Sequence, residues 1–280
     1  MKSSWLLAAG LTALAGLAVA AEHPGREFVV CSDPANMPYS NDRGEGFENR
    51  IAQLVADELH ATLRYTWNVQ RRSFLRRTLH AGACDVVIGL PAGLQGVVLT
   101  KPYYESSYAL VTLKSRGLSI TGFDDPFLRT LRIGLPAVGA EGSNAPPAAA
   151  LARRGLARQV RGFPVWGSEN DETPQAHIVD AVSAGEIDVA ILWGPQAGYF
   201  ARRHADRLAV TPVGEDPQQP ALPFRYAMAM GVRRGDETLR DELQQALDRR
   251  APEIRSILES YGIPLATHAA RLNLQPTQEQ

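Results

Sequence analysis

Two stretches that lie 103 residues apart repeat one design, and this repeat constrains the fold more than any other feature. The first runs from Ala81 through Ile88 into a Gly/Pro loop, and the second runs from Ala184 through Ile191 into a similar loop. In each, the Ala-Gly pair is typical of a helix end, and the apolar run after it is typical of a parallel strand covered on both faces. Open α/β sheets bind ligands at the carboxyl ends of such strands. The repeat therefore predicts two similar halves that face one another across a cleft.

Apolar residues in the rest of the chain extend this α/β pattern. Alternation with a period of two predicts strands, and spacing of three to four residues predicts helices. The expected strands are 27–32, 63–67, 85–88, 108–113, 131–135, 160–165, 188–192 and 226–232. The expected helices are 47–59, 73–80, 148–154, 174–184, 195–203 and a long stretch over 236–260 that Pro252 interrupts.

This order predicts a bilobal α/β fold of two Rossmann-like lobes joined by two crossing strands, near 107–113 and 226–231. We expect lobe 1 to comprise 22–112 and 228–280, and lobe 2 to comprise 113–227.

Residues 1–21 have the pattern of a signal peptide. A short positive stretch over 1–4 precedes an apolar run over 5–17, and 18–20 supply the small residues that a signal peptidase needs. An uncleaved membrane anchor is the alternative, but the run is short and two glycines interrupt it. We therefore expect a periplasmic protein that is soluble after cleavage and has no stable membrane insertion.

The charge balance excludes one class of partner. The formal net charge is -1, which argues against nucleic acid. Arginines outnumber lysines 26 to 3 and often stand in adjacent pairs. We interpret most of these arginines as exposed side chains on helix faces whose type reflects the base composition of the genome.

The chain has two cysteines, Cys31 and Cys84, too few for a disulfide scaffold. They could pair in an oxidising compartment. If they lie on adjacent parallel strands, however, their offset of roughly four residues places the Cα atoms beyond the ~7 Å limit for a bridge. The spacing thus favours two buried thiols.

Several motifs along the mature chain carry a resemblance to a known family. They are Cys31–Asn41, Gly44–Asn49, Gln70–Arg72, Cys84–Gly93, Thr100–Tyr104 and Trp193–Tyr199. As a set they resemble the type II periplasmic substrate-binding proteins of ABC importers and, more narrowly, the branch associated with quinoprotein dehydrogenases. The resemblance implies an accessory role beside a PQQ-dependent methanol or ethanol dehydrogenase and its cytochrome c. A periplasmic quinoprotein dehydrogenase is then the expected partner.

The segment after the third strand departs from ordinary amino-acid binders. The resemblance implies an arginine here that clamps the ligand carboxylate with two hydrogen bonds. The segment 91–100 contains no arginine or lysine, although Arg72 or Arg43 could approach from elsewhere. This departure argues against an amino-acid ligand.

Candidate residues for a small-molecule ligand or a partner lie in the loops at the expected cleft edges. Asp33, Asn36 and Tyr39 could face a ligand, or they could stabilise an Asx-type turn in a proline-rich loop. Trp193 and Tyr199 could stack on a ligand or partner, or they could pack the lobes together. The full predicted set is Asp33, Asn36, Tyr39, Phe47, Arg72, Pro91, Tyr103, Tyr104, Asn144, Trp193 and Tyr199.

Signatures of enzymes are weak in this chain. The six histidines are dispersed, no G-x-S-x-G or P-loop motif occurs, and Gly44-Glu45-Gly46 lacks the third glycine of a dinucleotide loop. We therefore expect no catalytic residue, metal or cofactor. Two alternatives stay open: an ABC-importer receptor for a small metabolite, and a cleft enzyme of dehydratase type with Lys101 and Glu48 as its acid/base pair. Asp85 and Asp188 precede their strands, so we interpret them as structural.

Overall fold

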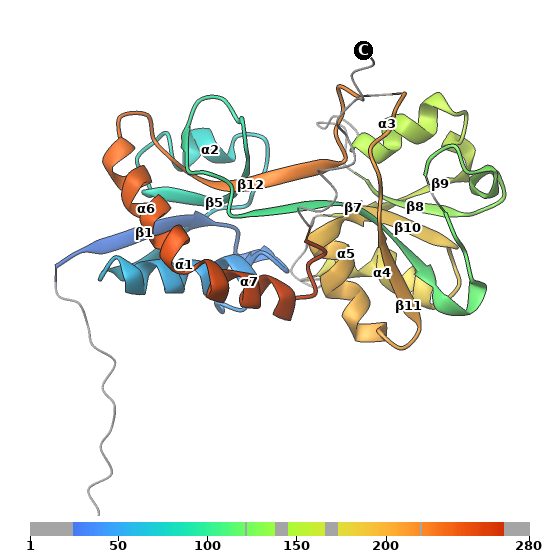
Figure 1. Ribbon diagram of the computed structural model, residues 1–280, viewed down its shortest axis with the longest axis horizontal. Helices are drawn as coiled ribbons and strands as arrows, with labels where there is room; N and C mark the ends of the chain where they lie inside the picture. Colours follow the sequence, from blue (N-terminus) through green and yellow to red (C-terminus); the bar gives the residue numbers. More distant parts are fainter. Residues whose placement is uncertain (1–24, 121, 138–144, 166–172, 219, 266–280) are drawn as a thin grey trace, which may run out of the picture.

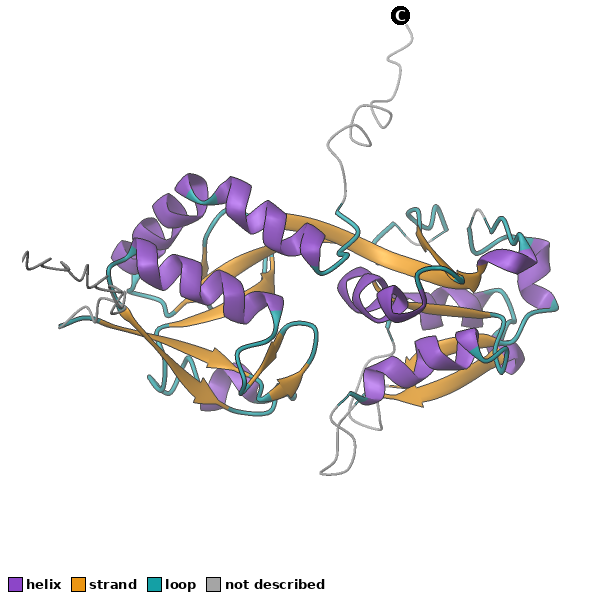
Figure 2. Ribbon diagram, turned by 90° about the horizontal axis from the view of Figure 1, so that it is seen from below, coloured by secondary structure: helices purple, strands orange, loops and turns teal. Residues whose placement is uncertain are grey.

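The structure, a computed structural model, describes residues 25–120, 122–137, 145–165, 173–218 and 220–265. These residues form two lobes joined by two long strands (Figure 1; Figure 2), which confirms the predicted fold class. Within the described ranges, none of the helices has both the length and the apolar character needed to cross a membrane. The predicted signal peptide and Asn144 lie outside the described residues.

Lobe 1 is built on the parallel strands β1 (Glu27–Ser32), β4 (Thr62–Trp67) and β5 (Val86–Pro91), in the order β4-β1-β5. Strand β12 (Arg225–Val232) adds to β5 in the antiparallel sense. Three short strands complete this part: β2 (Ala35–Asn36), β3 (Ser40–Asn41) and β6 (Val98–Leu99).

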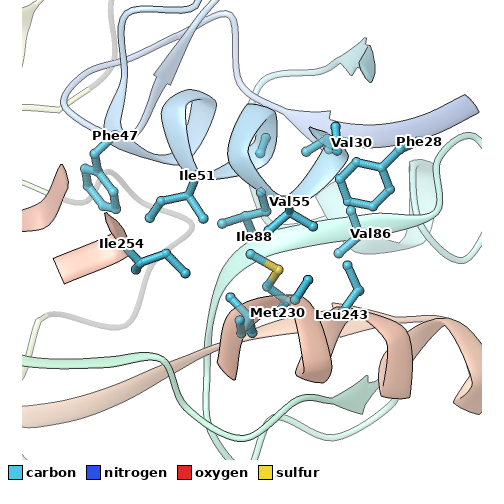
Figure 3. Packing of buried hydrophobic residues seen from close by; sticks show 14 of the residues in the cluster. Phe28, Val30, Phe47, Ile51, Val55, Val86, Ile88, Met230, Leu243 and Ile254 are labelled. Atoms are coloured by element: carbon cyan, nitrogen blue, oxygen red, sulfur yellow. The ribbon is translucent and has the colours of Figure 1, made fainter. Parts of the chain in front are cut away.

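Successive side chains of each strand point to opposite faces of this sheet. Both faces therefore carry apolar side chains, and helices cover both. Phe28 and Val30 join a core with α1 (Phe47–Glu58), α6 (Glu237–Arg249) and α7 (Ala251–Ser260) (Figure 3). On the other face of β1, Cys31 belongs to a second cluster with Phe74 of the short helix α2 (Phe74–Arg77), and Val29 packs against it. The break between α6 and α7 falls where Pro252 predicted it.

Lobe 2 is built on the parallel strands β10 (Val189–Trp193), β8 (Ile133–Ala137) and β9 (Val160–Pro164) in that order. At its edge, β11 (Leu208–Pro212) pairs with β7 (Tyr104–Leu113), the strand that crosses between the lobes. The helices of this lobe are α3 (Pro146–Arg153), α4 (His177–Ser183) and α5 (Gly194–Ala201).

Strand β7 (Tyr104–Leu113) connects the two sheets. Its first part, Tyr104 to Ser107, pairs with β12, and its second part pairs with β10 and β11. Both lobes therefore belong to one hydrogen-bonded path that narrows to β7 and β12 at the junction. The strand begins four residues before the expected start at 108, so it spans the whole junction.

Helix α2 is shorter than the predicted helix over 73–80. It ends at Arg77, because the Thr78 hydroxyl donates to the carbonyl of Phe74 over 2.7 Å and the backbone leaves the helical conformation there. Strand β11 was not predicted, since it is a short edge strand that pairs only with β7 among the described strands.

The expectation of two free thiols is wrong, because Cys31 and Cys84 form a disulfide with their Cα atoms 5.5 Å apart. Cys31 is opposite Val87, three residues beyond Cys84, so the register is close to the expected offset of roughly four residues. That argument fails because Cys84 lies before β5, where the chain is no longer extended along the sheet. The bridge fixes the approach to β5 on the face that α2 covers.

Candidate functional site

The loop after β1 is held by Asp33, which is buried. One carboxylate oxygen accepts from the backbone amide of Ala35 over 2.9 Å, which is an Asx-type turn, and the other accepts from the amide of Gln70 over 2.6 Å. The Asn36 side chain donates to the Gln70 side chain over 3.0 Å. The two predicted residues thus join this loop to the segment that follows β4.

Aromatic rings gather at the start of α1, around the fully buried Phe47. Its ring lies 5.4 Å from that of Tyr39, 6.1 Å from that of Tyr104 and 6.0 Å from that of Tyr261. Tyr103 contacts Tyr104 edge-on with the ring centroids 5.1 Å apart. The structure therefore brings four predicted residues, Tyr39, Phe47, Tyr103 and Tyr104, into one aromatic cluster.

Glu48 lies beside this cluster, and burial raises the pKa of its carboxyl to about 8. The carboxylate lies against the backbone of Gly89 in β5, where a β-carbon would come within 2.0 Å of Oε1. Burial also raises the pKa of the Tyr103 and Tyr104 hydroxyls well above its usual value. Among the described residues these two buried hydroxyls have no hydrogen-bond partner. The edge of lobe 1 is thus apolar in character, with a carboxyl that is mostly neutral at pH 7.

Sequence reasoning considered Glu48 only as the partner of Lys101 in a dehydratase. Lys101 is exposed, and its backbone amide donates to Gln244. The signal that could have identified Glu48 is Gly89, because a glycine inside an apolar strand marks a close approach of another group.

Two predicted residues of lobe 2 contact lobe 1. Trp193, at the end of β10, lies between the rings of Tyr108 and Tyr226, at 5.4 and 5.6 Å, and packs against the lobe 1 core. Tyr199 on α5 stacks on Tyr261, with ring centroids 5.7 Å apart and planes 20° apart. In these contacts the rings of Trp193 and Tyr199 pack the two lobes together, which is one of the two roles that the sequence left open.

A segment that sequence reasoning did not single out, Tyr261–Leu265, also joins the lobes. It follows α7 of lobe 1 and packs on α5 of lobe 2, where a β-carbon on Gly198 would lie 1.8 Å from the Gly262 carbonyl oxygen. Ser106 of β7 donates to the Pro264 carbonyl over 2.8 Å. The detectable signal was the pair Gly194 and Gly198, which keeps one face of α5 free of side chains.

The other predicted residues lie outside these contacts. Arg72 is exposed in the connection from β4 to α2, and Pro91 ends β5 opposite Met228 of β12. Two open hollows occur elsewhere, one of about 480 Å³ between α1 and α7 and one of about 450 Å³ in lobe 2. Apart from Tyr261 of the aromatic cluster, the residues lining them belong to neither the predicted set nor the contacts above.

Comparisons with known proteins agree along nearly the whole chain. Residues 28–262 match the profile of the bacterial extracellular solute-binding proteins, family 3. The chain is 30% identical over 286 positions to Protein MoxJ of Methylorubrum extorquens, and the match covers 92% of this chain and 93% of that relative.

Two solved structures are also similar. The periplasmic binding protein XoxJ from Methylobacterium extorquens AM1 has 35% identity and a TM-score of 0.70, with 86% of this chain and 100% of that one covered. MxaJ from Methlophaga aminisulfidivorans MPT has 26% identity and a TM-score of 0.74, with 85% and 100% covered.

Proposed function

We propose, from the premise that this chain belongs to family 3 of the bacterial extracellular solute-binding proteins, that it is a periplasmic accessory protein of a PQQ-dependent alcohol or methanol dehydrogenase. The observation that carries the proposal is the full-length similarity to MoxJ, XoxJ and MxaJ, together with the motif set that resembles the dehydrogenase-associated branch. The chain acts in this proposal as a binding protein and not as an enzyme.

The chemistry of the lobe 1 edge supports a protein partner over an amino-acid solute. A ligand carboxylate needs a cationic clamp, and 91–100 supplies neither arginine nor lysine. The edge instead presents Glu48, whose raised pKa keeps it mostly uncharged at pH 7. Neither feature favours a bound amino-acid carboxylate.

The contact region that we propose for the partner is the rim where the lobes meet. Asn36, Tyr39 and Trp193 are only partly buried there, and aromatic residues supply much of the binding energy at protein interfaces. Tyr104 is buried, so its contribution is to hold the rim in place.

Export to the periplasm is part of the proposal. The predicted signal peptide over 1–21 would direct it. The Cys31–Cys84 disulfide supports an oxidising compartment, because such bonds persist there and are rare in the cytosol.

Deletion of the gene tests the proposal against the importer alternative. We expect PQQ-dependent dehydrogenase activity in periplasmic extracts to fall and to return when the gene is restored. Uptake of amino acids and small metabolites should be unchanged. Calorimetric titration with the common amino acids should show no binding tighter than about millimolar, which corresponds to roughly 4 kcal/mol. Unchanged dehydrogenase activity, or micromolar binding of an amino acid, would favour an importer receptor.

A further inference from the structure

A strongly basic segment connects β4 to β5 on lobe 1. Residues 68–83, here called the arginine segment, carry four arginines and no aspartate or glutamate. All four, Arg71, Arg72, Arg76 and Arg77, are exposed. The whole chain has a net charge of -1, so this run of four arginines without a carboxylate differs from the balance of the chain as a whole.

Several arginines elsewhere form ion pairs with carboxylates. Arg154 is paired with Asp216 at 2.8 Å, and Arg249 and Arg250 share Glu58 at 2.5 and 2.8 Å. In the arginine segment, by contrast, Arg77 donates to the neutral Asn68 over 3.1 Å. Within the described part of the chain, Arg72 and Arg76 form no ion pair. Arg72 and Arg76 therefore present positive charge that no carboxylate among the described residues neutralises.

The fold holds the arginine segment in a fixed position. Phe74 and Leu79 are buried in the same cluster as the Cys31–Cys84 disulfide. At its amino end, Gln70 is bound by Asp33 and by the side chain of Asn36. A segment held in this way loses little conformational entropy when a partner binds.

An exposed apolar side chain stands next to these charges. Val69 is 42% exposed, and among the described residues only Phe127 is another large hydrophobic side chain with high exposure. Arginine is enriched at protein interfaces, and its planar guanidinium matches a carboxylate with two parallel hydrogen bonds. Val69 and the arginines together have the composition of a docking surface.

We infer that the arginine segment, with Val69, docks an acidic face of a protein partner. The inference rests on the proposed function, because it takes that partner from the dehydrogenase system. The Asn36–Gln70 hydrogen bond makes the surface continuous with the rim proposed above. Small anions bound at such exposed side chains stay hydrated and are screened by salt, whereas a protein surface excludes water over many contacts at once.

The first experiment titrates the mature full-length protein against the purified dehydrogenase of the same organism, and separately against its cytochrome c. The test variant is the double substitution Arg72→Gln with Arg76→Gln, which leaves Phe74, Leu79 and the disulfide in place. The control, Arg129→Gln with Arg158→Gln, removes the same charge from exposed positions on lobe 2.

We expect the test variant to bind one of these proteins about tenfold more weakly at low salt, mainly through a slower association rate, and the control to bind within about twofold of wild type. Raising the ionic strength should reduce the difference. Equal binding by wild type and the test variant overturns the docking inference and leaves the proposed function standing.

Poly-L-glutamate separates failure of the inference from failure of the proposed function. If wild type binds neither dehydrogenase nor cytochrome, the proposed function fails. Binding of poly-L-glutamate then tests the docking inference by itself. Binding of poly-L-glutamate that the test variant weakens and the control does not supports an acidic docking partner. Equal weakening of poly-L-glutamate binding by both variants overturns the inference. Phosphatidylglycerol-containing vesicles provide a second probe. A test variant that loses binding only to these vesicles, and still binds poly-L-glutamate as wild type does, also overturns the inference.

Discussion

The carboxylate of Asp188 accepts a hydrogen bond of 2.7 Å from the backbone amide of Arg132, just before strand β8. In lobe 1, Asp85 accepts from the backbone amide of Val29 in β1 over 2.8 Å, and both pairs are 56 residues apart in the chain. The 103-residue repeat in the sequence is therefore a repeat of structure. In each lobe an aspartate that precedes one strand accepts from a backbone amide of the parallel neighbour, within β1 in lobe 1 and just before β8 in lobe 2, as the structural interpretation of these residues predicted.

Asp188→Ala should destabilise the protein by about 2 kcal/mol at pH 7, because it removes this bond and the ion pairs with Arg116 and Arg132. Asp85→Ala should cost less, since Asp85 is more exposed and its ion pair with Arg233 is 3.8 Å long. Urea unfolding measures both. Equal losses for the two variants would contradict this ranking.

The effect of Asp188→Ala should also depend on pH. Hydrogen bonds from Arg132 hold the pKa of Asp188 below its usual value. A carboxyl with a lowered pKa contributes stability above its unfolded pKa and loses it as the pH falls through the folded value. The difference between wild type and Asp188→Ala should therefore shrink between pH 5 and pH 2. A constant difference would rule out this linkage.

Removing the disulfide should cost roughly 4 kcal/mol, because Cys31 and Cys84 are 53 residues apart and the bond restricts a long loop in the unfolded chain. The measurement compares thermal unfolding of wild type and of Cys31→Ala with Cys84→Ala, each with and without reductant. Reductant should lower the Tm of wild type only. A wild type that alkylates fully at both cysteines without reductant would show that the bond is absent.

Sequence reasoning located most strands and helices because they depend on local apolar periodicity. It failed for the disulfide because the distance between Cys31 and Cys84 depends on how the chain approaches β5, which strand spacing alone does not give. Glu48 and Tyr261 were missed as site residues for a related reason. Their surroundings come from segments distant in the sequence, such as Gly89 beside Glu48 and Tyr199 beside Tyr261.

Glu48→Gln should change the pH dependence of stability. Because burial raises the pKa of Glu48 to about 8, the folded protein binds one more proton than the unfolded chain between pH 4.5 and 8, and stability falls as the pH rises through that window. The ceiling is about 1.4 kcal/mol per pH unit. Between pH 5 and pH 8, the unfolding free energy of Glu48→Gln, measured with urea, should rise relative to that of wild type. The exposed Glu259→Gln serves as the control, and parallel curves for wild type and Glu48→Gln would contradict the assignment.

Gly198→Ala tests the contact between α5 and the segment after α7. The new β-carbon would lie 1.8 Å from the Gly262 carbonyl oxygen, so one of the two backbones must move. We expect a loss of about 1–3 kcal/mol in unfolding free energy. Gly214→Ala is the control, since a β-carbon added there would meet no atom within 4 Å. Equal unfolding free energies of the two variants would contradict this prediction, because the segment after α7 could then move away from α5 with no loss of stability.

The most direct test of the proposed role is a calorimetric titration of the mature wild-type protein with the purified PQQ-dependent dehydrogenase of its own organism. We predict saturable one-to-one binding with a Kd below about 10 μM at low ionic strength, weakening as salt is added. No measurable complex at low ionic strength, with the dehydrogenase active and the binding protein folded, would contradict the proposed role.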